Sequence, residues 1–372
     1  MTHDIAFIIA DLGCGGAQRV VATLASTWAR RGRRVCIITL ASPDDDFFKL
    51  DPGVTRLSLG GLGDTDSVMS AIGSNLLRLR QLRRAIREAE AGTVIAFLAS
   101  MNILTIIATL GLGLTVAISE RNDPTRQSHG RVWDLLRRLL YRHADLVTAN
   151  SRGALAALGG FVPDAKLVYA PNPIQPYSAT VAATARIDTL KFLIVARLNH
   201  QKAHDVLLDA FALIADKAPS WRLQVVGDGD LETALKRQAE TLGISDRVDW
   251  LRIAHDPYKC YVEADCFVLP SRFEGTPNAL LEAMGCGLPA IVSNASPGPL
   301  EHVKDNVNGL VVPVDNANAL AAAMERLAHD LELRQRLGQA ARKHIENHDP
   351  KKIIETWERF LDLTPVKNVE PA

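Results

Sequence analysis

The chain has 372 residues, of which 47% are hydrophobic and 23% are charged, and its formal net charge at pH 7 is zero. This length suggests two domains, and this apolar fraction excludes a disordered chain. A neutral balance disfavours a general nucleic-acid-binding protein. The five cysteines are odd in number and lack a Cys-x-x-Cys spacing, which argues against a disulfide framework or a zinc site.

The first half of the chain alternates between strand-like and helix-like segments. A strand at 5–10 leads into a glycine-rich turn, and a helix at 17–31 follows with apolar residues at helical spacing. The alternation continues with strand 34–40, helix 74–90, helix 131–142 and strand 146–149. This pattern predicts a doubly wound α/β domain over residues 1–172.

One segment of that domain, 93–119, carries no charged residue and is long enough to span a bilayer. We interpret it instead as strand 94–98, helix 103–110 and strand 115–118, because a fully covered parallel strand also forms a continuous apolar run. The N-terminus opens on a strand and lacks the basic-then-apolar order of a signal peptide. The expected location is therefore cytoplasmic.

The second half predicts another α/β domain. Residues 173–189 are rich in Pro, Ala and Thr, which is typical of a linker. In the domain expected at 190–348, the predicted strands lie near 191–196, 222–227, 248–251, 266–269, 289–292 and 310–312, and helices near 317–329 and 331–347 follow. The remaining segment, 349–372, contains a last helix at 350–361 and a tail.

Two carboxylates, Glu274 and Glu282, flank the start of a helix that opens near Pro277-Asn278. Glu274 follows an apolar strand directly, so it is expected at the carboxyl edge of a parallel sheet, where open α/β sheets bind ligands. The N–H groups of residues 278–280 would point into the same crevice and could hold a phosphate. The alternative is an ordinary turn followed by a surface helix.

A second strand-to-helix turn carries Arg197 and Lys202. The planar fork of arginine and the point charge of lysine both suit a diphosphate. Each residue alone is more often a solvated surface charge. Together with a helix start, they could neutralise a departing nucleoside diphosphate without a metal.

Four motifs in this order resemble the C-terminal domain of the retaining glycosyltransferases of family 4, which have the GT-B fold. They are Arg197 with Lys202, Gly227-Asp228-Gly229, Glu274 with Glu282, and Gly287-Leu288-Pro289. The N-terminal Gly15-Gly16-Ala17-Gln18-Arg19 is similar to the Gly-Gly-Ala-Glu-Arg loop of that family. The resemblance runs from about Ile5 to about Trp357. It implies two doubly wound Rossmann-like domains facing each other across a cleft, with the last helix crossing back to the first domain.

The resemblance also implies roles for the matching residues. Arg197 and Lys202 would hold the diphosphate, Glu274 would hydrogen-bond the donor sugar, and Glu282 would bind the ribose hydroxyls. The implied donor-binding set is Gly15, Gly16, Gly227, Asp228, Pro277, Asn278, Ala279 and Glu282. The co-substrate would be a nucleotide-diphospho-sugar, and no metal or other cofactor is expected.

Two further strings resemble a subgroup that builds bacterial surface polysaccharides on undecaprenyl diphosphate. They are Ser119-Glu120-Arg121-Asn122-Asp123-Pro124 and Ser296-Pro297-Gly298-Pro299-Leu300-Glu301. Glu120 is the candidate catalytic group on the acceptor side, because a carboxylate there could orient or deprotonate a hydroxyl. The chain departs from the wider family at Ala99-Ser100-Met101-Asn102, where many members have a histidine.

A basic face on the helix expected at 74–90 suggests a partner. Arg80, Arg83, Arg84 and Arg87 share one side of it, and Leu76, Leu79, Leu82 and Ile86 occupy the other. Such a helix can rest on anionic lipid or hold a diphosphate. This face predicts peripheral contact with the inner face of the plasma membrane, and the alternative is a solvated helix face.

Three patterns point to other chemistries and are set aside. Asp44-Asp45-Asp46 and Asp228-Gly229-Asp230 look like metal-binding Asp-x-Asp motifs, but we predict no metal. The loop 13–18 fails the dinucleotide pattern Gly-x-Gly-x-x-Gly at Gln18, which disfavours an NAD enzyme.

The predicted function is a retaining transfer of a hexose or N-acetylhexosamine from a nucleotide-sugar, with UDP favoured by the subgroup. The acceptor expected from that subgroup is a glycan, such as a polyprenyl-diphosphate-linked saccharide. The alternatives are a nucleotide-sugar epimerase of the same fold and a non-catalytic subunit.

Overall fold

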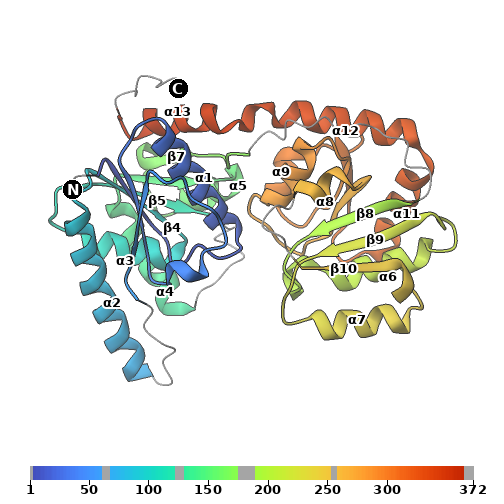
Figure 1. Cartoon of the computed structure of the whole chain (residues 1–372), viewed down its shortest axis with the longest axis horizontal. Coiled ribbons are helices and arrows are strands. Elements are labelled where there is room, and N and C mark those ends of the chain that lie inside the picture. The colour runs from blue at the N-terminus through green and yellow to red at the C-terminus, as the bar shows by residue number, and fades with distance from the viewer. Residues whose placement is uncertain (1–2, 61–67, 122–129, 175–188, 253–257, 364–372) are drawn as a thin grey trace. The chain divides into compact units, whose positions relative to one another are not determined.

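The computed structural model describes residues 3–60, 68–121, 130–174, 189–252 and 258–363. The chain forms two compact units, one made of residues 1–173 with 350–372 and the other of residues 174–349. Most of the expected linker, 173–189, lies outside the described residues. Figure 1 shows the two units with their elements labelled.

The first unit is built on a sheet of seven parallel strands in the order β3-β2-β1-β4-β5-β6-β7. The strands are β1 (Ile5–Ile8), β2 (Val35–Thr39), β3 (Val54–Ser58), β4 (Thr93–Phe97), β5 (Thr115–Glu120), β6 (Leu146–Ala149) and β7 (Leu167–Tyr169). Its helices are α1 (Gly16–Arg30), α2 (Val68–Ala89), α3 (Ala99–Thr109), α4 (Arg131–Leu140), α5 (Arg152–Leu158) and α13 (Pro350–Phe360).

Alternate residues of each central strand face two separate cores, as the period of two requires. Ile5 and Phe7 of β1 pack with α1 and α13, whereas Ala6 and Ile8 pack with α2, α3 and α5. Strands that are covered on both faces are mostly apolar, which explains why the segment 93–119 carries no charged residue. That segment forms β4, α3 and β5, as predicted. No helix among the described residues is long and apolar enough to cross a membrane.

The last helix, α13, belongs to the first unit and lies beside α1 (Figure 1). Glu358 is buried and accepts a hydrogen bond from Trp28 Nε1 at 3.1 Å. The same carboxylate forms an ion pair with Arg33 at 3.3 Å. A buried carboxylate needs such partners, so these contacts fix α13 onto the first unit although its sequence follows the second.

The second unit has six parallel strands in the order β10-β9-β8-β11-β12-β13. They are β8 (Leu190–Val195), β9 (Trp221–Val226), β10 (Val248–Leu251), β11 (Cys266–Leu269), β12 (Ala290–Ser293) and β13 (Gly309–Val312). The helices are α6 (His204–Ile214), α7 (Glu232–Thr241), α8 (Tyr258–Val262), α9 (Asn278–Gly285), α10 (Pro297–His302), α11 (Ala317–His329) and α12 (Leu331–Ile345). Both units are thus doubly wound parallel α/β structures, as the sequence predicts.

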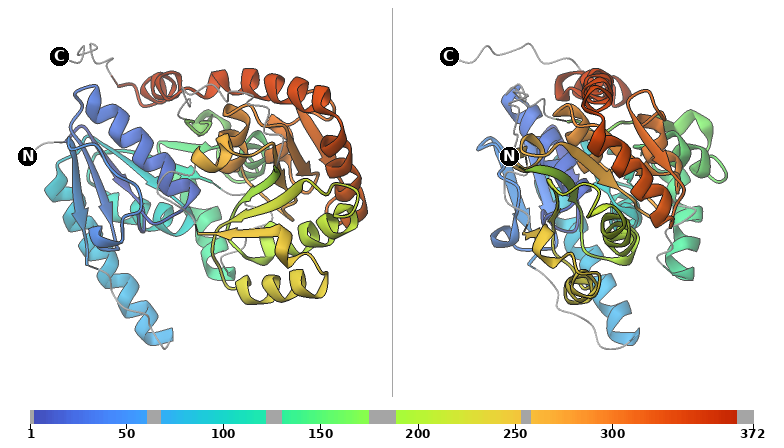
Figure 2. Two further views of the ribbon diagram at one scale, coloured as in Figure 1. Left: turned by 45° about the vertical axis from the view of Figure 1, so that its right-hand side comes forward. Right: turned by 90° about the vertical axis from the view of Figure 1, so that its right-hand side faces the viewer.

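The predicted apolar side of helix α2 is buried only in part. Leu76, which belongs to that side, is 49% exposed, and its neighbour Leu77 is 44% exposed. Further along the same side, Leu82 and Ile86 are buried. The reason is that the N-terminal part of α2 extends past the sheet, which is visible in both views of Figure 2.

Candidate active site

Four loops meet at the carboxyl edge of the second sheet because the strands β9, β8, β11 and β12 are neighbours. The loop after β8 carries Arg197 and Lys202, and the loop after β11 carries Glu274. Residues 227–229 follow β9, and the loop with Ser296 follows β12. Strand order therefore brings the predicted donor-side residues of the second unit to one edge, whereas Gly15 and Gly16 of the predicted set lie in the first unit.

An ion pair joins the two most important of these loops. Lys202 Nζ lies 2.5 Å from Glu274 Oε1, and the side chains are 18% and 7% exposed. Ser271 Oγ donates to the same carboxylate oxygen at 2.7 Å. The backbone N–H of Glu274 donates to Ser296 Oγ at 2.9 Å. Lys202 and Ser271 therefore restrict the orientation of the Glu274 carboxylate, and Ser296 holds its backbone.

Further hydrogen bonds tie the β8 and β11 loops together. Gln201 Nε2 donates to the carbonyl of Phe273, and the N–H of Arg272 donates to the carbonyl of Gln201. The Arg272 guanidinium also binds Asp205 Oδ2 at 2.7 Å. Burial alone would raise the pKa of Asp205, but the hydrogen bonds from Arg272 lower its pKa overall.

The other predicted donor residues on the β8 and β9 loops have mainly exposed side chains. Arg197 and Asp228 are both exposed. The glycine at 227 has φ +154°, and a Cβ there would lie 2.0 Å from the carbonyl oxygen of Ala196. The carbonyl of Asp228 accepts the N–H of Leu198 at 2.7 Å. Gly227 is therefore required for close packing of the two loops, whatever else it contacts.

Helix α9 and its N-cap contribute the remaining donor-side residues of the second unit. Pro277 stands at its N-cap, no side chain caps this end, and Asn278 and Ala279 are half-buried in its first turn. Glu282 is only 2% exposed and accepts a hydrogen bond from the hydroxyl of Tyr261 at 2.9 Å. The predicted ribose-binding carboxylate is thus almost fully buried and has a hydrogen-bond partner on α8.

The backbone of the β12 loop touches the backbone of the Glu274 loop. A Cβ at Gly298 would lie 1.7 Å from the carbonyl oxygen of Gly275. We expect Gly298→Ala to displace this loop and to lower the free energy of unfolding by about 1–3 kcal/mol, as overpacking does. Chemical denaturation measures this loss. Gly160→Ala is the control, because its Cβ would meet only ordinary contacts; equal stability of both variants would contradict the prediction.

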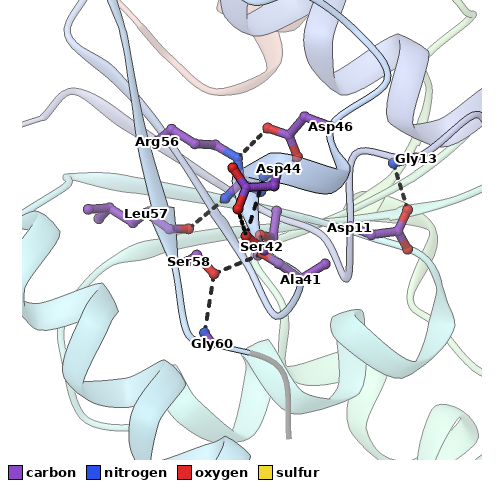
Figure 3. A network of polar contacts seen from close by, with 11 residues as sticks. Asp11, Gly13, Ala41, Ser42, Asp44, Asp46, Arg56, Leu57, Ser58 and Gly60 are labelled. Carbon is purple, nitrogen blue, oxygen red and sulfur yellow. Dashed lines mark hydrogen bonds and ion pairs between the residues drawn. The ribbon is translucent and has the colours of Figure 1, made fainter. Parts of the chain in front are cut away.

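In the first unit, the predicted glycine loop 13–16 leads into α1. Asp11 Oδ1 accepts the N–H of Gly13 at 2.9 Å, a contact drawn in Figure 3, and also accepts Gln18 Nε2 at 2.9 Å. A Cβ at Gly15 would lie 2.3 Å from Gln18 Oε1. Gln18, where a dinucleotide fingerprint has glycine, thus helps to shape the loop.

The acidic run at 44–46 lies in a polar network of its own (Figure 3). Arg56 forms a two-pronged ion pair with Asp46, with N–O distances of 2.8 and 2.9 Å. The hydroxyl of Ser42 accepts the N–H of Asp44. Over the described ranges, no three His, Cys, Asp or Glu side chains are grouped so that they could hold a metal ion.

Glu120, the predicted acceptor-side carboxylate, is buried at the end of β5 with 2% exposure. Its Oε2 accepts the hydroxyl of Tyr141 at 3.0 Å, and its Oε1 accepts the N–H of Arg121 at 3.2 Å. Burial and then the charge of Glu120 raise the pKa of Tyr141 well above its usual value. Asn102, in the string that replaces the family histidine, donates to the same hydroxyl.

The predicted basic face of α2 is divided by its contacts. Arg83 donates to the carbonyls of Ala108 and Leu110 at 2.7 and 2.9 Å, so it caps the end of α3. Arg84 forms an exposed ion pair with Glu88. The side chains of Arg80 and Arg87 are exposed. Arg83 therefore has a structural task that the helical pattern did not reveal.

The sequence analysis assigned no role to several polar residues that the structure places beside the predicted site residues. Ser271 and Tyr261 contact the two predicted carboxylates of the second unit. Arg121 is buried over the ring of Phe97, and burial lowers its pKa to about 9. A serine or tyrosine beside an apolar strand carries no local signal of such contacts, because its partner is distant in sequence.

The two doubly wound units and the basic and acidic loops at one sheet edge define an enzyme of the GT-B class. The chain belongs to the family 4 type of glycosyltransferases. Residues 183–344 match the family described as glycosyl transferases group 1, and residues 15–173 match the glycosyl transferase 4-like domain.

The curated relatives include two proteins of Campylobacter jejuni. One is named as a GalNAc-α-(1→4)-GalNAc-α-(1→3)-diNAcBac-PP-undecaprenol α-1,4-N-acetyl-D-galactosaminyltransferase. It is 29% identical over 366 residues, which cover 98% of this chain and 99% of the relative. The other is named as an N-acetylgalactosamine-N,N'-diacetylbacillosaminyl-diphospho-undecaprenol 4-α-N-acetylgalactosaminyltransferase and is 24% identical over 369 residues, 96% of this chain and 99% of the relative.

Solved structures of the same fold include Anabaena HepE in complex with UDP and glucose. Its TM-score is 0.79 at 17% identity, covering 97% of this chain and 100% of that one. Sucrose-phosphate synthase from Thermosynechococcus elongatus has a TM-score of 0.82 at 20% identity, covering 97% and 98%. These similarities confirm the predicted GT-B fold.

Proposed function

We propose that the enzyme transfers a hexose or N-acetylhexosamine, with retention, from a UDP-sugar to a polyprenyl-diphosphate-linked saccharide in bacterial surface polysaccharide synthesis. Both Campylobacter relatives carry names with undecaprenyl-linked acceptors and N-acetylgalactosamine transfer. The observation that carries the proposal is the Lys202–Glu274 pair at the carboxyl edge of the second sheet. A cation and a carboxylate fixed there suit a diphosphate and a sugar hydroxyl respectively.

The proposed reaction breaks the bond between the sugar C1 and the leaving phosphate oxygen, which keeps the electron pair. Lys202 and Arg197 would stabilise the charge that develops on that oxygen, and no metal is required in this scheme. Glu274 would hydrogen-bond the donor sugar and stabilise the positive charge of the oxocarbenium-like centre. The acceptor oxygen then attacks from the same face, and its proton passes to the leaving phosphate.

Glu120 remains the proposed carboxylate on the acceptor side. Its Oε2 already accepts the Tyr141 hydroxyl, so direct contact with an acceptor hydroxyl would require that hydrogen bond to break.

The alternative functions would require different residues. An epimerase would normally need acid/base groups in both domains, and a non-catalytic subunit would have no use for the Lys202–Glu274 pair.

The test is release of nucleoside diphosphate from a panel of UDP-, GDP- and ADP-sugars, with and without a polyprenyl-diphosphate-linked saccharide. Release from a UDP-sugar that increases with the lipid acceptor supports the proposal. Formation of the epimeric nucleotide-sugar would support the epimerase instead. Absence of release from every donor would overturn the proposed activity.

We also propose that the first unit contacts anionic membrane through α4 and the exposed arginines of α2. Val132, Leu135 and Leu139 share one face of α4 and are 69%, 57% and 49% exposed. The same short segment carries the exposed residues Arg131, Arg138 and Arg142. Apolar side chains between arginines fit the boundary of an anionic bilayer.

Replacing both Leu135 and Leu139 by aspartate should weaken binding to phosphatidylglycerol vesicles by on the order of tenfold or more, because each leucine would bury apolar area in lipid. Vesicle co-sedimentation at two salt concentrations measures the effect. Leu213→Asp is the matched control, since Leu213 is 52% exposed on α6 of the second unit. Equal binding of the double variant and the wild type would show that α4 does not touch lipid.

A further inference from the structure

Tyr261 combines complete burial with a hydrogen bond to a buried carboxyl group. It lies in helix α8 and is 0% exposed. Its hydroxyl donates to Glu282 Oε2 at 2.9 Å, and Glu282 lies 21 residues further along the chain in helix α9. A hydrogen bond to an ionised carboxylate is about twice as strong as one between neutral groups.

The ring of Tyr261 is fixed by packing that does not involve its hydroxyl. Its centroid lies 6.1 Å from that of Phe267 on β11, at an interplanar angle of 62°. The ring of Tyr258 lies 6.1 Å away at 71°. Edge-on contacts of this kind hold a phenylalanine equally well. The hydroxyl therefore has a fixed position from which it sets the orientation of the Glu282 carboxylate.

We propose that Tyr261 is a positioning residue that orients Glu282 toward the ribose of the nucleotide, an inference that rests on the proposed function. A carboxylate has two oxygens in one plane, so a hydrogen bond to Oε2 also restricts the positions that Oε1 can take. Two ribose hydroxyls can be recognised by a carboxylate only when that plane is fixed beforehand. Tyr261 itself touches no reacting atom, so its loss acts on donor binding rather than on bond cleavage.

The test is Tyr261→Phe, which removes the hydroxyl and keeps the packed ring. We expect the donor KM and the dissociation constant of UDP to rise about tenfold, because the Glu282 side chain must then be ordered when the nucleotide binds, with kcat nearly unchanged. Tyr258→Phe is the matched control on the same helix and should leave both constants near the wild-type values. Thermal melting of each variant verifies that the fold persists at the assay temperature.

A comparison of UDP with its 2′,3′-dideoxy analogue isolates the ribose. The wild type should prefer UDP. Tyr261→Phe should lose most of that preference, because the oriented Glu282 carboxylate binds the ribose hydroxyls. In a Glu282→Ala background, the same substitution should add no further change. An unchanged preference in Tyr261→Phe, or an equal loss of affinity for both nucleotides, would overturn the positioning role.

The outcomes also separate this inference from the proposed function. If the wild type binds UDP and transfers sugar, and Tyr261→Phe has the same affinity and activity, only the proposed role of Tyr261 is refuted. If the wild type binds none of UDP, GDP and ADP, both the proposed nucleotide-sugar activity and the proposed role of Tyr261 are refuted. A tenfold effect on ribose-bearing ligands alone supports both.

Discussion

Replacing Lys202 by alanine is expected to lower the kcat of sugar transfer by on the order of 100-fold or more. Cleavage leaves negative charge on a phosphate oxygen, and removal of one preorganised donor from such a site costs about that factor. Lys202 is preorganised by its contact with Glu274, which holds the ammonium at 2.5 Å. The 18% exposure of its side chain limits screening by water.

Single-turnover assays with the active donor measure this effect apart from product release. Lys202→Arg is the matched control, because it keeps the charge and should retain more activity than Lys202→Ala. Glu274→Gln removes the charge of the partner, keeps its shape and should also reduce transfer strongly. If Lys202→Ala transferred sugar at the wild-type rate, the leaving phosphate would have to be stabilised elsewhere.

Acidification is expected to lower the stability of the protein strongly, through a histidine cluster in the second unit. The buried ring of His302 lies 5.2 Å from the ring of His348 and 5.7 Å from that of His344, between centroids. Neither ring nitrogen of His302 has a hydrogen-bond partner among the residues that the structure describes. Burial, followed by the charges of His348 and His344, lowers the pKa of His302 to about 3. Folded His302 is therefore neutral over the whole physiological range.

The consequence for stability follows from proton linkage. In the unfolded chain, a histidine has a pKa of about 6.5 and takes up a proton below that pH. Because the folded pKa of His302 is lower, the unfolded state binds more protons, so stability is full above pH 6.5 and falls as the pH drops toward 3. Between pH 7 and pH 5, this residue alone should cost about 2 kcal/mol.

Chemical denaturation of the wild type and of His302→Leu at pH 7 and pH 5 measures the effect. Leucine cannot take up a proton, so the variant should lose about 2 kcal/mol less than the wild type over this range. The exposed His329 provides the control, and His329→Leu should follow the wild-type curve. A parallel pH dependence of His302→Leu and the wild type would show that His302 does not govern the acid response.

The sequence by itself determined the sequential order of most helices and strands and the family. Apolar periodicity located β10 and β11 at their observed bounds, and the order strand, turn, helix placed Lys202 and Glu274 each in a loop after a strand. These signals succeed because they depend on residues near one another in the chain. The strands β3 and β7 were not predicted: β3 is only half-buried for most of its length, and β7 has only three residues.

Only the tertiary structure decided which distant residues meet. β8 lies beside β11 although about 70 residues separate them, and this pairing makes the Lys202–Glu274 contact possible. The burial of Glu120 against Tyr141 and the link from Tyr261 to Glu282 have the same origin. Long-range strand order and packing arise from burial summed over the whole fold, and no local pattern in the sequence encodes that sum.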